Sequence, residues 1–549
     1  MKKLCLLFFS ICLVINLCSQ QLLAQPSALQ RPKLVVGIVV DQMRWDYLYR
    51  YYDRYGNDGF KRMLSEGFSC ENTFISHLPS YTAVGHSTIF TGSVPAIHGI
   101  VGNDWIDQLT GRAWYCTEDT TVQTVGASDH VGEMSPRNLL ASTITDELKL
   151  ASNFRSKVVG VSLKDRASIL PAGHAADGAF WFDDAAGSFV TSSYYMNDLP
   201  QWAKDFNAKN EPEKLVANNW NTLYPLNTYQ ESTSDNVSWE GKFKGEQATT
   251  FPHPLASIYK ASHGSIRTTP FGNQLTLDFA EAAVTGYALG QGKATDFLTI
   301  NCASTDYVGH QYGPNSIEVE DTYLRLDRQL AAFFHFLDQK VGKGNYLVFL
   351  SADHGAAHSI GFMEAHHIPA GYLDFSPLAK NLNALLEKQF GISGLVREIT
   401  NYQVNFDLSK IADHQMDIDT IKKVSIDFLQ KQPGVEFAID ISHIGESAVP
   451  EPLKTMIING YQFKRSGQIQ IVNDPGWIEG HTGGTGTTHG TWNPYDTHIP
   501  LLFMGWGIHH GTTNQTVHMT DIAPTVAALL HIQMPNGCIG SVIESVVTK

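Results

Sequence analysis

Two pairs of aspartate and histidine residues occur in settings that suit metal binding. Asp353 and His354 are adjacent in the segment SADHG, and Asp306 and His310 are four residues apart in STDYVGHQYG. A spacing of four residues places both side chains on the same face of a helix. Each pair follows an apolar run that is typical of a buried strand. Since ligands bind beyond the carboxyl ends of parallel strands, both pairs are candidate metal ligands.

A third aspartate and a third histidine extend this set. Asp41 directly follows the apolar run KLVVGIVV, and His489 lies in the Gly/Thr-rich segment GGTGTTHGTWNPYDTHIP. His481 and His498 are close to His489 in the sequence, so position alone does not choose among the three histidines. Asp41 could also be an ordinary turn or helix-capping residue.

Together these residues suggest a two-metal site. Mixed carboxylate and imidazole ligands suit zinc, and carboxylate-rich sites also suit manganese or magnesium. Six protein ligands are too many for one catalytic zinc ion, which keeps an open position. They suit two metal ions that stabilise the attacking and leaving oxygens in phosphoryl displacement. The candidate ligands are Asp41, Asp306, His310, Asp353, His354 and His489.

The segment LPSYTAVGHST offers several hydroxyl groups that could act as a nucleophile. A hydroxyl is a poor nucleophile unless a base or a metal activates it. On chemistry alone Ser80, Thr82, Ser87 and Thr88 are all possible, and Ser80 or Thr82 could instead cap a helix. The residue pattern therefore leaves the choice open.

Three further polar residues could bind an anion beside the metals. Asn103 lies in IVGNDW, and Lys164 and Arg166 lie in SLKDR, just after an apolar run. Beside a metal pair, the two cations would bind anionic oxygens, with arginine supplying a planar fork of donors. Away from such a site, Asn103 would be a turn residue and the cations would be solvated.

The elements that must position these residues are predicted from five short apolar runs. Such near-continuous runs are typical of parallel strands that are buried on both faces. Helical patterns separate the runs, for instance residues 318–338. We therefore predict an α/β fold with a doubly wound, mostly parallel sheet. The runs are residues 33–40, 158–163, 297–302, 346–351 and 500–505.

Two stretches fit the alternation of strands and helices poorly, and we interpret them as insertions. Residues 170–290 are rich in Asn, Tyr, Trp and Ser and are predicted to be partly irregular. Residues 365–475 mix helical patterns (378–389, 418–431 and 453–461) with strand-like runs (402–406, 435–439 and 468–472), which predicts a small α+β cap.

The composition limits the class of protein. Among 549 residues, 43% are hydrophobic and 17% are charged, which is typical of a globular protein. The formal net charge of −15 argues against general nucleic-acid binding, because that requires a basic surface.

The first residues are predicted to be a secretory signal. Lys2 and Lys3 precede an apolar run, residues 4–17, that is too short to span a bilayer comfortably. We assign residues 1–24 to the signal, with cleavage near Ala24, and residues 25–549 to the mature catalytic domain. A lipoprotein signal at Cys18 is disfavoured because Leu17 occupies a position that normally holds a small residue. The protein is thus expected in the periplasm or outside the cell, and no other segment is predicted to span a membrane.

Four cysteines remain after the predicted cleavage, and they are widely scattered. Such an arrangement is not a disulfide framework, and the absence of a CxxC pair disfavours cysteine-based metal binding. Cys302 falls inside a predicted strand and is expected to be a packed free thiol. The four residues are Cys70, Cys116, Cys302 and Cys538.

The motifs taken together resemble the alkaline phosphatase superfamily. The run LPSYTAVGHSTIFTGSVPAIHGI, followed in order by GN, SLKDR, TDYVGH, ADHG and TTHG, is similar to the secreted, threonine-nucleophile alkaline phosphatases of the PafA type. The resemblance implies that Thr82 is the nucleophile and is activated by the zinc ion held by Asp41, Asp353 and His354. It implies one zinc ion held by Asp41, Asp353 and His354, and a second held by Asp306, His310 and His489. It assigns Asn103, Lys164 and Arg166 to the phosphate oxygens.

The resemblance also implies an activity. We expect an enzyme that hydrolyses small phosphate monoesters through a phosphothreonine intermediate at a di-zinc site. A phosphodiesterase or nucleotide pyrophosphatase on the same scaffold is the main alternative. A sulfatase is disfavoured because its nucleophile is a modified Cys or Ser. A non-catalytic zinc- or phosphate-binding export protein has no need for a hydroxyl against a metal pair, so Thr82 argues against it.

Overall fold

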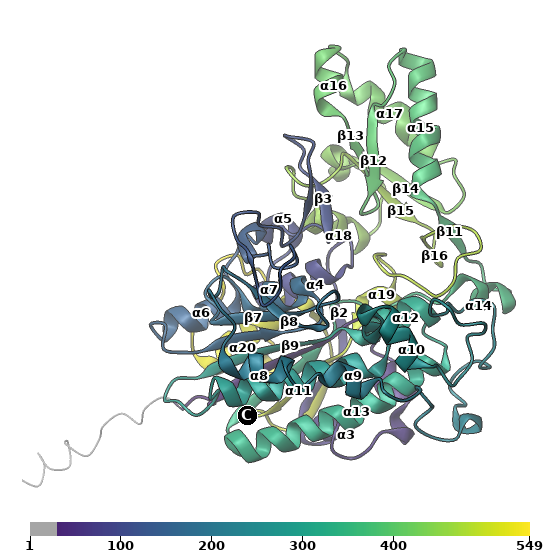
Figure 1. Ribbon diagram of the computed structural model, residues 1–549. Helices are drawn as coiled ribbons and strands as arrows, with labels where there is room; N and C mark the ends of the chain where they lie inside the picture. Colours follow the sequence, from purple (N-terminus) through teal and green to yellow (C-terminus); the bar gives the residue numbers. More distant parts are fainter. Residues whose placement is uncertain (1–29, 549) are drawn as a thin grey trace, which may run out of the picture.

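The computed structural model describes residues 30–548 of the chain (Figure 1). The predicted signal, its cleavage site and the alternative at Cys18 lie outside these residues. None of the helices within residues 30–548 combines the length and the apolar character that a membrane crossing needs.

Five parallel strands form the middle of an eleven-stranded sheet. β1 (Leu34–Val40) pairs with β10 (Tyr346–Ser351) on one side and with β9 (Asp296–Cys302) on the other. β6 (Val158–Val161) and β7 (Gly178–Asp183) continue the parallel order beyond β9. All of their residues are buried, which explains the continuous apolar runs of β1, β6, β9 and β10 and confirms the predicted fold class.

The two edges of the sheet contain antiparallel pairs. β18 (Leu501–Gly505) runs antiparallel to β10, so the prediction that this apolar run is a parallel strand was wrong. A continuous apolar run reports burial on both faces and carries no information on strand direction. The other strands are β2 (Phe68–Phe74), β17 (His498–Ile499) and β19 (Gly511–His518) at one edge, and β8 (Ser188–Ser192) and β5 (Thr124–Val125) at the other.

Helices cover both faces of this sheet. Figure 1 shows α11 (Pro270–Gly286) and α13 (Ile317–Leu337) along one face, and α4 (Thr82–Thr91) and α7 (Asp165–Ala172) on the other. Strands β7 and β8 and helix α11 fall within residues 170–290, so the ends of this predicted insertion belong to the core. Only short helices, among them α8 (Gln201–Asn207) and α10 (Leu255–Ala261), lie between β8 and the 3-10 turn that precedes α11.

The cap predicted from residues 365–475 is a separate α+β lobe, seen at the top of Figure 1. Its sheet has the order β12 (Val396–Thr400), β13 (Gln403–Phe406), β15 (Ile469–Asn473) and β14 (Val435–Asp440). Helices α15 (Phe375–Phe390) and α17 (Ile418–Leu429) contribute to its own hydrophobic core. β11 (Gly371–Leu373) and β16 (Trp477–Glu479) pair with each other at the base of the lobe.

The parallel strands deliver polar residues to one edge of the sheet. Asp41 follows β1, Lys164 follows β6, and Asp353 follows β10. α12 (Ser304–Tyr312) begins directly after β9 and presents Asp306. Because β1, β6, β9 and β10 all run in the same direction, their carboxyl ends bring these side chains together.

Candidate active site

All six predicted metal ligands converge beyond the carboxyl ends of the central strands. The Nε2 atom of His354 lies 3.7 Å from Asp41 Oδ1 and 3.4 Å from Asp353 Oδ2. Asp306 Oδ1 lies 3.1 Å from His310 Nε2 and 3.7 Å from His489 Nε2. The Asp306–His310 spacing in α12 thus places both side chains on one face, as predicted.

The three histidines share one hydrogen-bonding arrangement. The Nδ1 atom of His310 lies 2.8 Å from the carbonyl oxygen of Thr487, and the corresponding distances are 3.0 Å from His354 to Gly355 and 2.7 Å from His489 to Ser80. A carbonyl can only accept, so each Nδ1 is the donor. In the neutral ring each Nε2 then carries the lone pair, and it faces the carboxylates, as in a metal-binding histidine.

Two carboxylate oxygens in the cluster have no hydrogen-bond partner. Asp41 Oδ1 and Asp353 Oδ2 are buried and unpaired. Burial, together with the nearby Asp353 carboxylate, raises the pKa of Asp41 to about 7. Buried carboxylates without donors are costly, and a divalent cation would supply the missing partner. The residues present therefore fit a metal pair.

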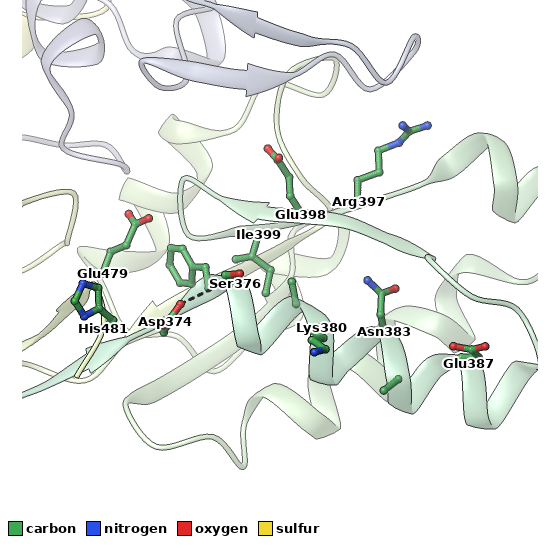
Figure 2. Close-up of a pocket in the computed structure, with 14 residues that line it drawn as sticks. Asp374, Ser376, Lys380, Asn383, Glu387, Arg397, Glu398, Ile399, Glu479 and His481 are labelled. Carbon is green, nitrogen blue, oxygen red and sulfur yellow. Dashed lines mark hydrogen bonds between the residues drawn. The ribbon is translucent and has the colours of Figure 1, made fainter. Parts of the chain in front are cut away.

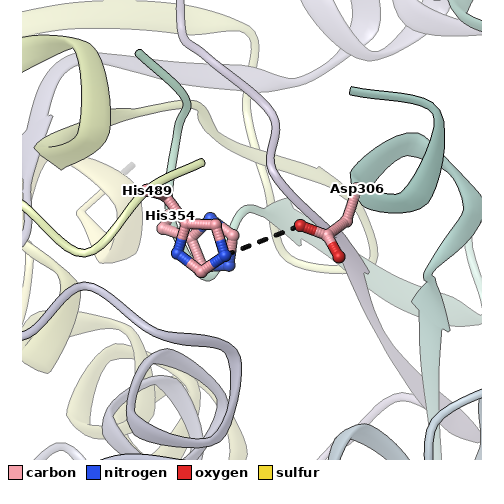
Figure 3. Close-up of side chains that lie close together, drawn as sticks. All are labelled: Asp306, His354 and His489. Carbon is pink, nitrogen blue, oxygen red and sulfur yellow. Dashed lines mark ion pairs between the residues drawn. The ribbon is translucent and has the colours of Figure 1, made fainter. Parts of the chain in front are cut away.

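The closest ligand groups differ from those implied by the resemblance. Asp306, His354 and His489 offer atoms within 4.8 Å of one another, and so do Asp41, Asp353 and His86. Figure 3 shows the rings of His354 and His489 overlapping beside Asp306; their centroids are 3.5 Å apart. His354, which the resemblance places with Asp41 and Asp353, thus lies within reach of both groups.

Thr82 is the first residue of α4 and is 1% exposed. Its Oγ1 atom lies 3.5 Å from His354 Nε2 and 3.5 Å from Lys164 Nζ. The side chain of Asn103 accepts a hydrogen bond of 3.0 Å from the backbone N–H of Ala83, so Asn103 lies at the same helix N-terminus. A helix N-terminus favours negative charge, which suits a phosphate group beside Thr82.

The other candidate hydroxyls are engaged elsewhere. Ser80 donates to the carbonyl of Thr491, and Ser87 donates to the carbonyl of Ala83 one turn earlier. Thr88 Oγ1 pairs with His98 at 3.2 Å. Of the four hydroxyls, the one that faces the cluster is that of Thr82.

The competing histidines are also separated from the cluster. His498 hydrogen-bonds the carbonyl of Glu71 and stacks on Trp45. His481 is exposed and lines a groove of the cap. Of the three histidines left open by the sequence, the structure brings His489 to the carboxylates.

Lys164 lies between the two acidic groups. Its Nζ atom is 2.9 Å from Asp41 Oδ2 and 2.7 Å from Asp306 Oδ2. Burial alone would lower the pKa of Lys164, but the two carboxylates outweigh burial and raise it above its ordinary value. Lys164 is therefore a fixed cation at the centre of the site.

Arg166 is held by the hairpin that follows Asn103. Its guanidinium donates a 3.1 Å hydrogen bond to the hydroxyl of Tyr115, which itself donates to Asp165. Tyr115 ends β4 (Ala113–Tyr115), which pairs with β3 (Asp104–Ile106). The Nε atom of Arg166 is buried and unpaired, so a donor remains for an anion.

Two residues at the site were missed by sequence reasoning. His86 lies one turn after Thr82; its Nδ1 donates to the Thr82 carbonyl at 2.8 Å and is 3.4 Å from Asp353 Oδ2. Gln42 donates from its backbone to Asp353 Oδ1 and from its side chain to Asp306 Oδ1. The spacing of four between Thr82 and His86 was a usable signal for the first. No signal in the sequence pointed to Gln42.

Comparisons with known proteins identify the family of this chain. The family described as type I phosphodiesterase / nucleotide pyrophosphatase matches residues 35–496. Alkaline phosphatase PafA of Elizabethkingia meningoseptica is 58% identical over 95% of this chain and 96% of its own. Alkaline phosphatase PhoV of Synechococcus elongatus is 54% identical over 94% of this chain and 93% of its own. The crystal structure of wild-type PafA superposes with a TM-score of 0.93, over 95% of this chain and 100% of that one.

The sheet, the cluster at its carboxyl edge and these similarities define a hydrolase of the alkaline phosphatase superfamily. The chain belongs to the type I phosphodiesterase / nucleotide pyrophosphatase family and, within it, to the PafA-type alkaline phosphatases. Its activity is the hydrolysis of phosphate monoesters.

Proposed function

We propose that the enzyme uses two zinc ions and a covalent phosphothreonine intermediate on Thr82. The observation that supports this most strongly is the shared arrangement of His310, His354 and His489. Each Nδ1 bonds a backbone carbonyl and each Nε2 faces the carboxylate cluster, in which Asp41 and Asp353 each keep one unpaired oxygen. One zinc would be held by Asp41, Asp353 and His354, and the other by Asp306, His310 and His489. When bound, the metal pair would lower the pKa of the Thr82 hydroxyl and neutralise charge on the leaving oxygen.

Thr82 and the polar side chains around it would carry out the other parts of the reaction. Thr82 Oγ1 attacks phosphorus, so that a new P–O bond forms as the bond to the leaving alcohol breaks. Lys164, Arg166 and Asn103 bind the non-bridging oxygens and hold the phosphoryl group in line with Thr82. Water then attacks the phosphothreonine, which releases inorganic phosphate and restores the Thr82 hydroxyl.

We also propose that the enzyme is exported and acts on small phosphate esters outside the cytoplasm. The basic and apolar pattern of residues 1–24 supports this location. The natural setting would then be the periplasm or the medium.

One set of assays tests the proposed function. The purified protein is assayed on an aryl phosphate monoester, the matched diester and the matched sulfate, with the metal content of the same sample measured. We expect two zinc ions per chain and a clear preference for the monoester. A preference for the diester, or full activity with no bound metal, would contradict the proposal.

Lys164 and Arg166 are expected to make the enzyme prefer monoesters over diesters. A monoester dianion presents three non-bridging oxygens, whereas a diester replaces one of them with a carbon substituent. A buried cation facing that substituent would lose its partner and keep its desolvation cost. Replacing either residue with alanine should lower kcat/KM for the monoester roughly tenfold or more, at about 1.4 kcal/mol per factor of ten, and change the diester much less.

Arg166→Ala is the cleaner of these two variants. Lys164 contacts Asp41 and Asp306, whereas the guanidinium of Arg166 hydrogen-bonds Tyr115. Loss of Lys164 can therefore also disturb the metals, and zinc content should be measured in both variants. If Arg166→Ala has its full zinc content and loses the same factor in kcat/KM on the monoester and on the diester, then Arg166 does not bind the additional non-bridging oxygen of the monoester.

Gln42 is expected to position Asp306 and Asp353 for the metals. It is 3% exposed and has a φ of 62°, a left-handed conformation that is costly for glutamine. A Cβ on Gly309 would lie 1.9 Å from Gln42 Oε1, so the amide packs against the backbone of the α12 turn between Asp306 and His310. Gln42→Gly keeps the backbone conformation and removes the amide, so zinc affinity should fall roughly tenfold.

The readout for Gln42 is a zinc titration against a chelator, with the melting temperature of the metal-depleted protein as the control. Relief of backbone strain should leave that melting temperature equal or higher in Gln42→Gly. Gln42→Glu keeps the size but places a carboxylate against Asp306, and it should disturb the site more. Unchanged zinc affinity in Gln42→Gly would refute the positioning role.

A further inference from the structure

The cap contacts the catalytic domain through the turn of a β-hairpin. Strands β12 and β13 are joined by Asn401 and Tyr402, and the pair of Thr400 and Gln403 closes the turn. The turn of a hairpin usually lies at the surface, yet Asn401 is 9% exposed and Tyr402 is 3% exposed. We call Asn401 and Tyr402 the hairpin tip.

Both residues of the hairpin tip have a left-handed backbone conformation. The φ angle is 55° at Asn401 and 58° at Tyr402. A two-residue turn with positive φ at both positions is normally built by asparagine followed by glycine. Asparagine tolerates this conformation, but a bulky residue such as tyrosine is strained in it. Such strain persists where the surrounding contacts fix the residue, and it is typical of functional segments.

Asn401 contacts the residues on both sides of Asn103. Its Nδ2 donates a 2.7 Å hydrogen bond to the carbonyl of Asp104. A Cβ on Gly102 would lie 2.5 Å from the same nitrogen, so the amide packs directly on the Gly102 backbone. Asn103 Oδ1 accepts from the backbone N–H of Ala83, which leaves Asn103 Nδ2 to donate to a phosphate oxygen. Asn401 therefore holds the backbone that aims this donor.

The ring of Tyr402 lies beside two other segments of the site. A Cβ on Gly490 would lie 3.0 Å from Tyr402 Cε2 and 2.5 Å from Tyr81 Cε1, so both rings pack on the Gly490 backbone. Gly490 directly follows His489 in the chain. Tyr81 directly precedes Thr82 and packs against the hydrophobic core of the cap, to which Tyr402 belongs. Tyr402 thus contacts the neighbours of a proposed metal ligand and of the proposed nucleophile.

Hydrogen bonds to the base of the cap hold both tyrosines in place. The backbone N–H of Glu479 donates to the Tyr402 hydroxyl at 3.2 Å, and the Tyr81 hydroxyl donates to the Glu479 carboxylate at 3.2 Å. The carbonyl of Tyr402 accepts a 2.8 Å hydrogen bond from the backbone of Ile471 in β15. Figure 2 shows β12 running from Arg397 toward the side of the view on which Glu479 lies. The contacts of its ring, hydroxyl and carbonyl thus fix Tyr402 in its strained conformation.

We propose that the hairpin tip is a positioning element of the phosphomonoesterase site. Asn401 orients Asn103 for the phosphate oxygens. The ring of Tyr402 fixes the backbone beside Thr82 and His489. The inference rests on the roles proposed above for these three residues of the catalytic domain. Because one turn contacts all three segments, it sets their positions relative to one another, and a small displacement of such groups can cost a large factor in rate.

A double-mutant cycle between Asn401 and Asn103 tests this proposal most sharply. Asn401→Gly suits the left-handed turn and removes the amide, so kcat/KM for an aryl phosphate monoester should fall roughly threefold to tenfold. Asn103→Ala removes the phosphate contact itself. In the Asn103→Ala background, Asn401→Gly should change kcat/KM by less than about twofold, because the group that Asn401 positions is already absent.

Tyr402 is tested by two substitutions that separate its ring from its hydroxyl. Tyr402→Phe keeps the ring on Gly490, and its kcat/KM should stay within about threefold of the wild type. Tyr402→Gly suits the backbone but removes the ring, and it should lower kcat/KM roughly tenfold at full zinc content. Both variants are assayed well below their melting temperatures, so that lost stability is not mistaken for lost positioning. If Tyr402→Gly does not fold, the cycle between Asn401 and Asn103 still decides.

Gln415→Gly is the matched control. Gln415 lies in the turn between α16 (Leu408–Asp413) and α17 of the same lobe, has a φ of 52° and is exposed. This substitution relieves the same kind of backbone strain away from the hairpin tip, so it should leave kcat/KM unchanged. A loss as large as that of Asn401→Gly would contradict a specific role of the hairpin tip.

The outcomes separate the positioning role from the activity itself. Equal losses from Asn401→Gly in the wild-type and Asn103→Ala backgrounds would overturn the positioning role and leave the proposed reaction in place. Wild-type kcat/KM in both Asn401→Gly and Tyr402→Gly would do the same. Unchanged kcat/KM in Asn103→Ala would instead overturn the phosphate-binding role of Asn103, on which the proposal rests.

Discussion

Replacing Thr82 with alanine is expected to lower kcat/KM for an aryl phosphate monoester roughly a thousandfold or more. The variant lacks the atom that would accept the phosphoryl group, and removal of a catalytic nucleophile typically has effects of this size. Steady-state kinetics at full zinc content would measure the loss. A small remaining activity is expected, because water could attack phosphorus directly at the same charged site.

Thr82→Ser is the matched control. It keeps a hydroxyl at the start of α4, so it should retain appreciable activity and normal zinc content. Near-normal turnover by Thr82→Ala would show that the threonine is not the nucleophile. Equal losses of kcat/KM in Thr82→Ser and Thr82→Ala would lead to the same conclusion.

Removal of a metal ligand should abolish metal binding and activity together. Asp353→Ala and His310→Ala, one from each proposed zinc group, should each lose most bound zinc and reduce kcat/KM by roughly three orders of magnitude. Each substitution leaves a buried charged cluster with one ligand fewer. Elemental analysis and kinetics on the same preparations would measure both effects.

The control for this prediction is His481→Ala. His481 lies in the segment that leads to His489, but its side chain is exposed and lines a groove of the cap. It should keep its zinc and its activity. A wild type that binds a single metal ion, or that remains fully active after exhaustive chelation, would refute the two-zinc account.

Much of the fold could be predicted from the sequence because the central strands are buried on both faces. The runs at β1, β6, β9 and β10 are continuous and apolar, and a polar residue of the site follows each of them within a few positions. The same signal gave the wrong direction for β18, because an antiparallel strand with neighbours on both sides is equally apolar. β7 was hidden in a stretch whose aromatic and polar composition resembled an insertion.

The site was predictable where a ligand follows a strand and ambiguous where a loop supplies it. Asp41 and Asp353 were found from position alone. His489 could not be separated from His481 and His498 without the family resemblance, because a loop of glycines and threonines has no periodicity that fixes direction. In the structure the distinction comes from long-range contacts, such as the hydrogen bond from His489 to the carbonyl of Ser80.

Gln42 illustrates a residue that no sequence pattern could reveal. Its role depends on a left-handed backbone and on two contacts with aspartates that are 264 and 311 positions away in the chain. Neither feature can be recognised from the type of the residue or from its spacing to other residues in the sequence. Residues of this kind, which orient ligands without binding metal, emerge from the packed structure alone.

Covalent catalysis by Thr82 is tested most directly by mass spectrometry of the enzyme quenched in acid during turnover of a phosphate monoester. We expect a mass increase of one phosphoryl group on the peptide that contains Thr82, assigned to Thr82 by fragmentation. The adduct should be absent from Thr82→Ala and from enzyme stripped of its zinc. A phosphoryl group on Ser80 or Ser87 instead, or a fully active enzyme that never carries one under conditions that trap the intermediate, would contradict a phosphothreonine intermediate on Thr82.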